Sequence, residues 1–276
     1  MCRVLAVSRS GYYRWTKNGL SNRAKENITL TYMIKEIFED SKKTYGSPRI
    51  REQLNRNGFT VSQRRVAKLM RKSNLYCRRN KKFRVTTSSN HAHPISPNLL
   101  KQDFKVERIN QVWVSDITYV HTGEGWLYLT IILDLFDRQI IGWNLSKRLK
   151  TTDTIIPAWN MATDKRQITK DLIFHSDRGV QYAAHKFRNL IKSNKLITQS
   201  MSRKANCWDN AVAESFFKTL KVECVYQEIY KTRKEAELSI FEYIEIWYNR
   251  KRLHSGLNYL TPIEYENQYN QLINVA

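Results

Sequence analysis

The order of strand-like and helix-like segments between residues 106 and 222 restricts the fold more than any other feature of this sequence. Three segments rich in β-branched and aromatic residues follow one another with only short turns between them, which predicts three strands in meander order. Helix-like and strand-like segments then alternate, and the whole order predicts a mixed α/β sheet with helices on both faces. The predicted strands are 111–120, 126–133, 139–145, 172–174 and 196–198, and the predicted helices are 151–164, 183–194 and one that begins at Asp209 or Asn210 and passes Lys221.

Positive charge is concentrated ahead of this segment. The formal net charge is +22, and residues 1–105 carry 24 Lys and Arg against 6 Asp and Glu, whereas residues 106–276 carry 23 against 19. A basic module in front of a nearly balanced one is typical of proteins that bind nucleic acid through its phosphates. A ribosome-associated protein or a merely basic surface is the alternative, and we expect double-stranded DNA as the partner.

The chain lacks the patterns of a membrane or secreted protein. It has no run of eighteen apolar residues, and its four cysteines are scattered without a C-x-x-C pair. We therefore expect no membrane partner, no zinc ribbon and a cytoplasmic protein with reduced thiols.

The basic region has the pattern of a helix-turn-helix. An amphipathic helix is predicted at 26–40. A second helix is predicted with Ser47 as its N-cap and Pro48 at its first position, ending at Asn57-Gly58, and a third begins after its cap Ser62. The third helix would enter the major groove of DNA, unless the region is an ordinary small helical bundle with a solvated basic face. Its outward-facing cations are Arg64, Arg65, Lys68, Arg71 and Lys72.

These patterns divide the chain into four parts. We expect a helical DNA-binding region at 1–80, a basic linker at 81–105, an α/β catalytic core at 106–222 and a helical extension at 223–276. The two prolines, the Ser/Thr-rich stretch and the dense basic run support the linker.

Three acids are placed where a metal site needs them. Asp116 lies in the middle of a strand, Asp177 follows a buried strand beside Gly179, and Glu214 lies one turn into a helix. A charge inside a strand destabilises the fold unless something such as a cation offsets it, and strand ends are where open α/β sheets place their sites. Each acid alone is more often structural, but together they predict a shared metal site.

The residue types indicate phosphodiester chemistry. Cleavage needs an activated oxygen nucleophile and a stabilised leaving oxygen, and two Mg²⁺ ions about 3.5–4 Å apart provide both. Hard cations prefer carboxylate oxygens, whereas the His and Cys ligands that suit zinc are missing here. Asp116, bridging the two ions, would be the most sensitive of the three acids.

At these residues the sequence resembles the OrfB-type insertion-sequence transposases, a group within the retroviral-integrase superfamily. The matching motifs occur in order along nearly the whole chain, which makes the resemblance specific. They are YGSPRI at 45–50, WVSDITY at 113–119, LDLFDR at 133–138, HSDRGVQY at 175–182, SMSRK at 200–204, NCWDNA at 206–211, ESFFKTLK at 214–221, YNRKRLH at 248–254 and LTP at 260–262.

The resemblance implies a ribonuclease-H-like core, a D,D,E catalytic triad on Asp116, Asp177 and Glu214, and two Mg²⁺ or Mn²⁺ ions. It implies action on the terminal inverted repeats of an insertion sequence, where water frees a 3′-hydroxyl that then attacks a second phosphodiester, and copying through a circular DNA intermediate. It also implies an upstream OrfA-type partner or fused segment. We expect several copies of the chain to act together on DNA.

Other residues have two interpretations each. His175 either orients Asp177 or is a hydrogen-bonded structural residue, and Trp208 either packs in the core or stacks on a base. Asp134 and Asp137 either cap a turn or supply a fourth metal ligand. Further DNA contacts are expected at Arg203, Lys204, Lys218, Lys221, Arg250 and Arg252.

Two rival functions remain at this point. Another nuclease of the ribonuclease-H-like class would need no basic helix-turn-helix in front of its core. A DNA-binding regulator without enzymatic activity would leave the acid inside the strand, Asp116, unexplained.

Overall fold

The computed structural model describes residues 1–77, 94–204 and 206–275, and the chain divides into two compact units, Met1–Arg78 and Arg79–Ala276. The dense basic run at 78–84 and the following polar stretch, predicted as part of the linker, lie outside the described residues. Among the described residues, no helix is both long enough and apolar enough to cross a membrane.

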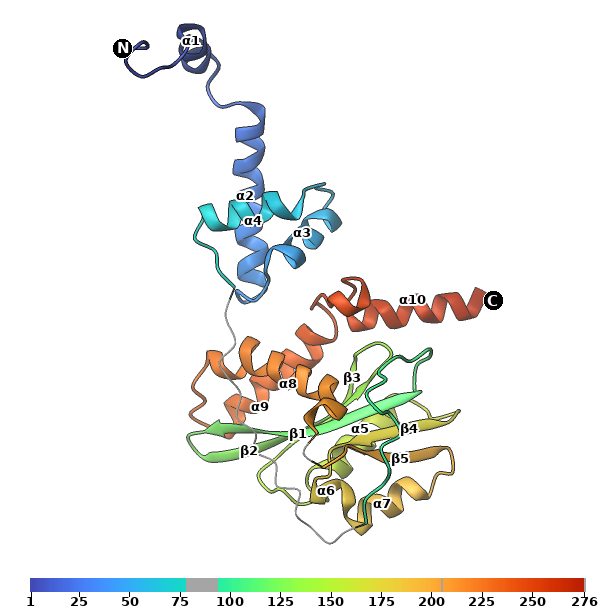
Figure 1. Ribbon diagram of the computed structural model, residues 1–276. Coiled ribbons are helices and arrows are strands. Elements are labelled where there is room, and N and C mark those ends of the chain that lie inside the picture. Colours follow the sequence, from blue (N-terminus) through green and yellow to red (C-terminus); the bar gives the residue numbers. More distant parts are fainter. Residues whose placement is uncertain (78–93, 205, 276) are drawn as a thin grey trace. The chain divides into compact units, whose positions relative to one another are not determined.

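The first unit is all-helical. Its helices are α1 (Arg9–Asn18), α2 (Asn22–Asp40), α3 (Ser47–Arg56) and α4 (Gln63–Lys72) (Figure 1). The last three pack around a small apolar core, while α1 buries none of its residues. The side chains of this core are Leu30, Ile34, Ile37, Phe38, Ile50, Leu54, Val66, Leu69 and Met70.

Capping residues set where these helices begin. The Ser8 hydroxyl accepts from the Gly11 N–H at 3.2 Å. The Ser62 hydroxyl accepts from the Arg65 N–H at 3.3 Å, as predicted. The prediction that Ser47 caps α3 is wrong by one residue, because Gly46 holds the cap position and Ser47 is already helical.

The second unit is built on a five-stranded sheet. The strands are β1 (Val112–Thr122), β2 (Gly125–Asp134), β3 (Ile140–Ser146), β4 (Leu172–Ser176) and β5 (Ile197–Met201). Their spatial order is β3-β2-β1-β4-β5. β1, β2 and β3 are antiparallel neighbours, whereas β4 and β5 run parallel to β1 and to each other. The predicted mixed sheet is confirmed.

Helices cover both faces of the sheet (Figure 1). α8 (Ala211–Glu223) and α9 (Arg233–Phe241) pack on the face formed by alternate β2 residues such as Leu129 and Ile131. α5 (Ile155–Lys165), α6 (Val180–Ala183) and α7 (His185–Lys192) pack on the opposite face, against Trp113 and Ile132. The two-residue period of the strands therefore divides the apolar side chains between two cores.

The structure departs from the predicted elements in three places. α5 begins at Ile155 rather than after Thr151, because residues 151–154 form turns. The predicted helix at 183–194 is broken at Ala184, whose ψ of 140° is extended, so α6 and α7 are separate. β4 extends through His175 to Ser176, which carries the strand up to Asp177.

The C-terminal part of this unit is helical, as predicted. A π-helical segment, Glu242–Tyr248, continues α9, and α10 (Pro262–Val275) follows after a short 3-10 turn at Ser255–Leu257. Tyr243, Ile244 and Tyr248 bury their side chains in the same core as α8. The extension therefore belongs to the second unit rather than to a separate body.

Candidate active site

Asp116 and Asp177 lie beside each other where two parallel strands part. β1 and β4 are paired with Ser115 opposite Ser176, so the next residue along each strand direction carries a carboxylate. β4 ends at that point, whereas β1 continues to Thr122. Strand register alone therefore brings together two acids that are far apart in the chain, at the carboxyl end of β4.

Backbone N–H groups hold both carboxylates. Asp116 Oδ1 accepts from the Ile117 N–H at 2.8 Å, and Asp177 Oδ1 accepts from the Gly179 N–H at 2.9 Å. Gly179 has a φ of −59°, which any residue can adopt. A Cβ atom there would lie 2.9 Å from Asp177 Oδ1, so the lack of a side chain leaves room for this carboxylate.

Helix α8 brings Glu214 to the same end of the sheet. The Asn210 side chain, just before α8, donates from Nδ2 to the Ser115 carbonyl at 3.0 Å, one residue before Asp116. Phe216 and Phe217 are buried against the sheet, and Glu214 is exposed on the first turn. Asp116 points to this face of the sheet, since it shares the two-residue alternation of the core residues Val112 and Val114.

The three carboxylates influence one another electrostatically. Burial raises the pKa of the Asp116 carboxyl well above its usual range, and the negative charges of Asp177 and Glu214 raise it further, while Lys221 acts in the opposite direction. Burial and the charge of Asp177 also raise the pKa of Glu214. Mutual repulsion of this kind places the acids in one neighbourhood.

Lys221 lies beside the acids. It is half-buried on α8, its pKa is lowered by burial, and the charge of Asp116 opposes that change. It shares a face of α8 with Glu214 by the i, i+7 spacing. Lys218, in contrast, is exposed. The two lysines predicted to contact DNA therefore differ: Lys218 is exposed to solvent, whereas Lys221 is half-buried beside Asp116.

The donor chemistry of the site fits a hard divalent cation. Carboxylate oxygens are the ligands that Mg²⁺ and Mn²⁺ prefer, and a cation between the acids would offset the repulsion among their negative charges. Among the described residues, however, no three His, Cys, Asp or Glu side chains are already arranged to hold an ion. The exposed Glu214 side chain is the member with room to move.

Both ring nitrogens of His175 lie within hydrogen-bond distance of buried serine hydroxyls. It is fully buried in β4, Nδ1 lies 2.8 Å from the Ser200 hydroxyl and Nε2 lies 3.2 Å from the Ser202 hydroxyl. Burial lowers its pKa to about 4, which keeps the ring neutral at pH 7. Of the two interpretations, the hydrogen-bonded structural residue agrees with these contacts.

A buried acid anchors the segment that precedes α8. Asp209 is fully buried and accepts from the Arg203 N–H at 2.8 Å, from its guanidinium at 2.9 and 3.0 Å, and from Gln102 Nε2 at 3.0 Å. Arg203 pairs with Asp209 through its guanidinium, but its side chain is 56% exposed, so its phosphate contact stays a prediction. Lys204 is exposed. No local pattern in the sequence indicates that Asp209 and Arg203 are partners.

Asp134 and Asp137 cap the turn between β2 and β3, as the first of their two interpretations predicted. Asp134 accepts from the Phe136 N–H at 2.9 Å, and Asp137 accepts from the Gln139 N–H at 2.9 Å. Both also pair with the buried guanidinium of Arg166, at 2.6 and 2.5 Å. These contacts occupy the carboxylates and contradict a role as a fourth metal ligand.

Arg252 is not a DNA contact in this structure. Its guanidinium is 5% exposed and donates two bonds of 2.8 Å to the carboxylate of Glu223 at the end of α8. The Tyr243 hydroxyl donates to the same carboxylate at 2.9 Å. The prediction is wrong because alternation and charge cannot distinguish a buried arginine from an exposed one. Arg250 is exposed.

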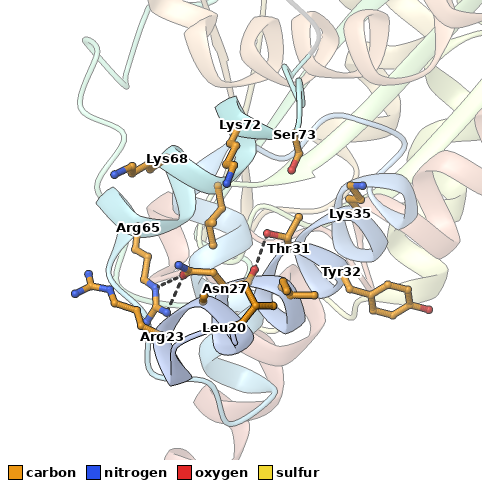
Figure 2. A pocket seen from close by; sticks show the side chains of 13 residues that line it. Leu20, Arg23, Asn27, Thr31, Tyr32, Lys35, Arg65, Lys68, Lys72 and Ser73 are labelled. Carbon is orange, nitrogen blue, oxygen red and sulfur yellow. Dashed lines mark hydrogen bonds between the residues drawn. The ribbon is translucent and has the colours of Figure 1, made fainter. Parts of the chain in front are cut away.

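The helical unit presents a basic groove between α2 and α4 (Figure 2). Arg65 does not face outward as predicted, because it bonds to Glu26 at 2.9 and 3.1 Å and to the Asn27 side chain at 2.8 and 3.0 Å. It holds α4 against α2. The other predicted cations of α4 are exposed, and they are Arg64, Lys68, Arg71 and Lys72.

Trp208 is 71% exposed just before α8, so the interpretation as a core residue is wrong. A base-stacking role stays open.

Comparisons with known proteins agree with this architecture. Residues 24–83 match a model described as an HTH-like domain, and residues 106–207 and 214–269 match models described as an integrase core domain. The chain is 43% identical to a 31 kDa protein of insertion element IS600 from Shigella sonnei, over 99% of both chains. It is 39% identical to the transposase InsF of insertion sequence IS3A from Escherichia coli strain K12, over 97% of this chain and 93% of that one. The catalytic core domain of BIV integrase aligns with 59% of this chain and 99% of that one, at 19% identity and a TM-score of 0.43.

Proposed function

The chain belongs to the family of IS3-type insertion-sequence transposases with an integrase core domain, and from this premise we propose that Asp116, Asp177 and Glu214 are its catalytic acids. Its enzyme class is that of polynucleotidyl transferases, its catalytic unit has a ribonuclease-H-like fold, and its HTH-like domain implies DNA binding. The reaction would be cleavage at the 3′ ends of an insertion sequence followed by strand transfer into target DNA.

One observation supports the site assignment above the others. The parallel register of β1 and β4 places Asp116 next to Asp177, and the Asn210–Ser115 bond draws the start of α8 to the same point. Burial is the main cause of the raised pKa values of Asp116 and Glu214, and the negative charge of Asp177 raises both further, which agrees with that convergence. Three acids brought together from β1, the end of β4 and α8, whose mutual repulsion contributes to the raised pKa values of Asp116 and Glu214, fit a cation site.

Each residue would have a separate task. Two Mg²⁺ or Mn²⁺ ions bound by the three carboxylates would supply activation of the attacking oxygen and stabilisation of the leaving one. Asp116 and Asp177 are pre-oriented by their backbone N–H bonds, and Glu214 would complete the set by a side-chain rotation. Lys221 would balance the charge of Asp116, and Lys218, exposed on the same helix, would contact the DNA backbone.

The bond changes are the same in both steps. Attack by water on the phosphorus breaks its bond to the 3′ oxygen, which leaves as a 3′-hydroxyl after taking up a proton. That hydroxyl then attacks a phosphodiester of the target, and the displaced oxygen takes up a proton in turn. The same three carboxylates would serve both attacks.

The remaining parts of the chain would bring DNA to this site. We propose the four-part division made from the sequence, in which the unit at 1–80 binds the terminal inverted repeats. The described end of the predicted linker packs on the catalytic unit, since Leu100 is buried in its core and Gln102 bonds to Asp209. Several copies of the chain would assemble on the two element ends, together with an OrfA-type partner or a fused upstream segment. In the cell, the protein would be found at the nucleoid when bound.

A nicking assay tests the catalytic assignment. The substrate is duplex DNA that contains an element end, and the unaltered chain should nick it only with Mg²⁺ or Mn²⁺. Asp116→Asn should abolish nicking and leave DNA binding intact, whereas Asp164→Asn, the same change at an exposed acid on α5, should leave both unchanged.

The outcomes separate the rival functions. Metal-dependent cleavage without preference for element ends would indicate a different nuclease of the same fold, and binding without any cleavage would indicate a regulator. Full strand transfer by Asp116→Asn would show that the site assignment is wrong.

A further inference from the structure

Asn210 holds the N-cap position of α8, but its side chain does not cap the helix. An asparagine at this position usually accepts a hydrogen bond from one of the first helical N–H groups through its side-chain oxygen. The structure shows no side-chain cap bond for Asn210. The residue is only 3% exposed, and its Nδ2 donates to the Ser115 carbonyl at 3.0 Å. The amide is therefore turned away from the helix and toward β1.

The Ser115 carbonyl points to the place where β1 and β4 part. The Gln111 carbonyl accepts from the Ile173 N–H of β4 at 3.0 Å, and carbonyls of an extended chain point to alternate sides. The Ser115 carbonyl, four residues later, therefore points to the side of β4 as well. In a continuing ladder the N–H of Asp177 would donate to it, but β4 ends one residue earlier. The Asn210 amide therefore lies where the two strands separate.

Two of the proposed catalytic acids flank this point. Asp116 follows Ser115 on β1, and Asp177 is the first residue after β4. Asp116 points to the face of the sheet that α8 covers, so its carboxylate and the Asn210 amide lie on the same side of the sheet. Because Oδ1 and Nδ2 share one carbon, Asn210 Oδ1 lies within about 6 Å of the Ser115 carbonyl oxygen. The amide oxygen therefore belongs to the neighbourhood of both carboxylates.

This amide oxygen is buried without a donor. In the part of the chain that the structure describes, Asn210 Oδ1 accepts no hydrogen bond. A buried acceptor in this state destabilises the fold, and two nearby carboxylates add to the effect because they carry negative charge as well. A cation held by the carboxylates would offset both, since amide and carboxylate oxygens are the hard ligands that Mg²⁺ and Mn²⁺ prefer.

We propose that Asn210 Oδ1 is an oxygen ligand of the cation that Asp116 and Asp177 hold. The bond from Nδ2 to the Ser115 carbonyl fixes which end of the amide faces the cation, so that the oxygen and not the NH₂ group is presented. The ligand set then contains a neutral oxygen that is already in place, whereas Glu214 joins it from the exposed first turn of α8.

This inference rests on the proposed function, because it assumes that the acids bind a divalent cation. The competing explanation is that Asn210 only holds the start of α8 against β1 through the Ser115 carbonyl. The two explanations assign the purpose of the side chain to different atoms, Oδ1 in the first and Nδ2 in the second. Variants that retain one of these atoms and not the other therefore separate them.

The experiment measures the binding of Mn²⁺ alone to the full chain at pH 7, by the electron paramagnetic resonance of free Mn²⁺. Asn210→Ala removes both the oxygen and the bond to Ser115, and should weaken Mn²⁺ binding roughly tenfold to a hundredfold. Asn210→Asp also lacks the NH₂ group but keeps an oxygen at the same position, and should bind Mn²⁺ at least as tightly as the unaltered chain. Equal weakening by the two variants would overturn the proposal and leave Asn210 as an anchor of α8. Unchanged binding by Asn210→Ala would overturn it too.

A control variant tests the effect of charge alone. Ser215→Asp adds a carboxylate at an exposed position on the first turn of α8, and should change the Mn²⁺ affinity by less than about fivefold. A tenfold gain in this variant would show that added charge, and not a ligand, explains the result for Asn210→Asp. If circular dichroism shows that Asn210→Ala does not fold, Asn210→Asp decides alone, because binding weaker than that of the unaltered chain would refute the proposal.

Asp116→Asn separates failure of this inference from failure of the proposed function. Mn²⁺ binding that is lost in Asp116→Asn but unchanged in Asn210→Ala would refute only the role of Asn210. Mn²⁺ binding that is the same in Asp116→Asn and in the unaltered chain would refute the proposed metal site itself.

Discussion

Replacing Arg252 with methionine should destabilise the catalytic unit strongly. The arginine is 5% exposed, its two charge-assisted bonds to Glu223 are both 2.8 Å long, and the carboxylate is 6% exposed. Such bonds contribute about 1.5–3 kcal/mol each, and removing one partner of a buried pair costs about 3–5 kcal/mol because the other charge stays buried. The lower part of that range is expected, since Tyr243 still donates to Glu223.

Urea unfolding at pH 7, followed by tryptophan fluorescence, measures this loss. Six of the seven tryptophans lie in the catalytic unit and only Trp15 lies in the helical one, so the signal reports on the right unit. For a unit of this size, the expected loss of free energy corresponds to a Tm roughly 6–20 °C lower.

Two comparisons make the result interpretable. Arg250→Met changes an exposed arginine two positions away and should alter stability by less than about 0.5 kcal/mol. Adding Glu223→Gln to Arg252→Met removes the unpaired charge but keeps an acceptor for Tyr243, and should recover much of the loss. If Arg252→Met changed stability by less than about 1 kcal/mol and weakened DNA binding instead, the residue would be a DNA contact and the reasoning from burial would fail.

Three further outcomes are expected. Asp209→Asn should cost about 2–3 kcal/mol at pH 7, because Arg203 holds the pKa of this carboxyl below its usual range. The ionised Asp209 carboxylate stabilises the fold above pH 4, and this stabilisation is lost as the pH falls and the carboxylate takes up a proton. The difference in the free energy of unfolding between Asp209→Asn and the unaltered chain, measured by urea titration, should therefore shrink below pH 4. Gly179→Ala adds a Cβ that would lie too close to Asp177 Oδ1, so it should slow nicking roughly tenfold to a hundredfold. DNA binding, measured by gel shift, should stay unchanged. An unaltered nicking rate would show that the loop can move to accommodate the Cβ. Lys68→Ala should weaken DNA binding and reduce the salt dependence of the binding constant by about 1 in slope. Arg65→Ala should mainly lower the Tm of the helical unit, because Arg65 pairs with Glu26. The reverse pattern would show that Arg65 contacts DNA.

Features encoded in short stretches of sequence were predictable. The β-branched run around Asp116 predicted β1, Ser62 predicted the start of α4, and the order of elements predicted the mixed sheet. Such features depend on neighbours a few residues away, where side-chain period and capping chemistry act. The placement of Asp177 at a strand end followed from the same kind of local reasoning.

Contacts between distant residues were not predictable in this way. Arg166 and Arg252 look like surface cations in the sequence, and only the folded chain shows that each neutralises acids 29 or more positions away. Arg65 is similar, because its partners Glu26 and Asn27 lie on another helix. A buried arginine and an exposed one have the same local pattern, so charge alone overestimated the DNA-binding surface.

Contacts at the two ends of α8 bear on how the proposed active site would close. The start of α8 is tied to β1 through Asn210 and Ser115, and its end is tied to the C-terminal extension through Glu223 and Arg252. Between those ends, the helix buries aromatic residues against the sheet. Moving α8 as a body toward Asp116 would break contacts that each contribute on the order of 1–3 kcal/mol, whereas rotating one exposed carboxylate breaks none of these. In the proposed site, the adjustment that brings a third carboxylate to the two aspartates is therefore expected from the exposed Glu214 side chain, with α8 held in place.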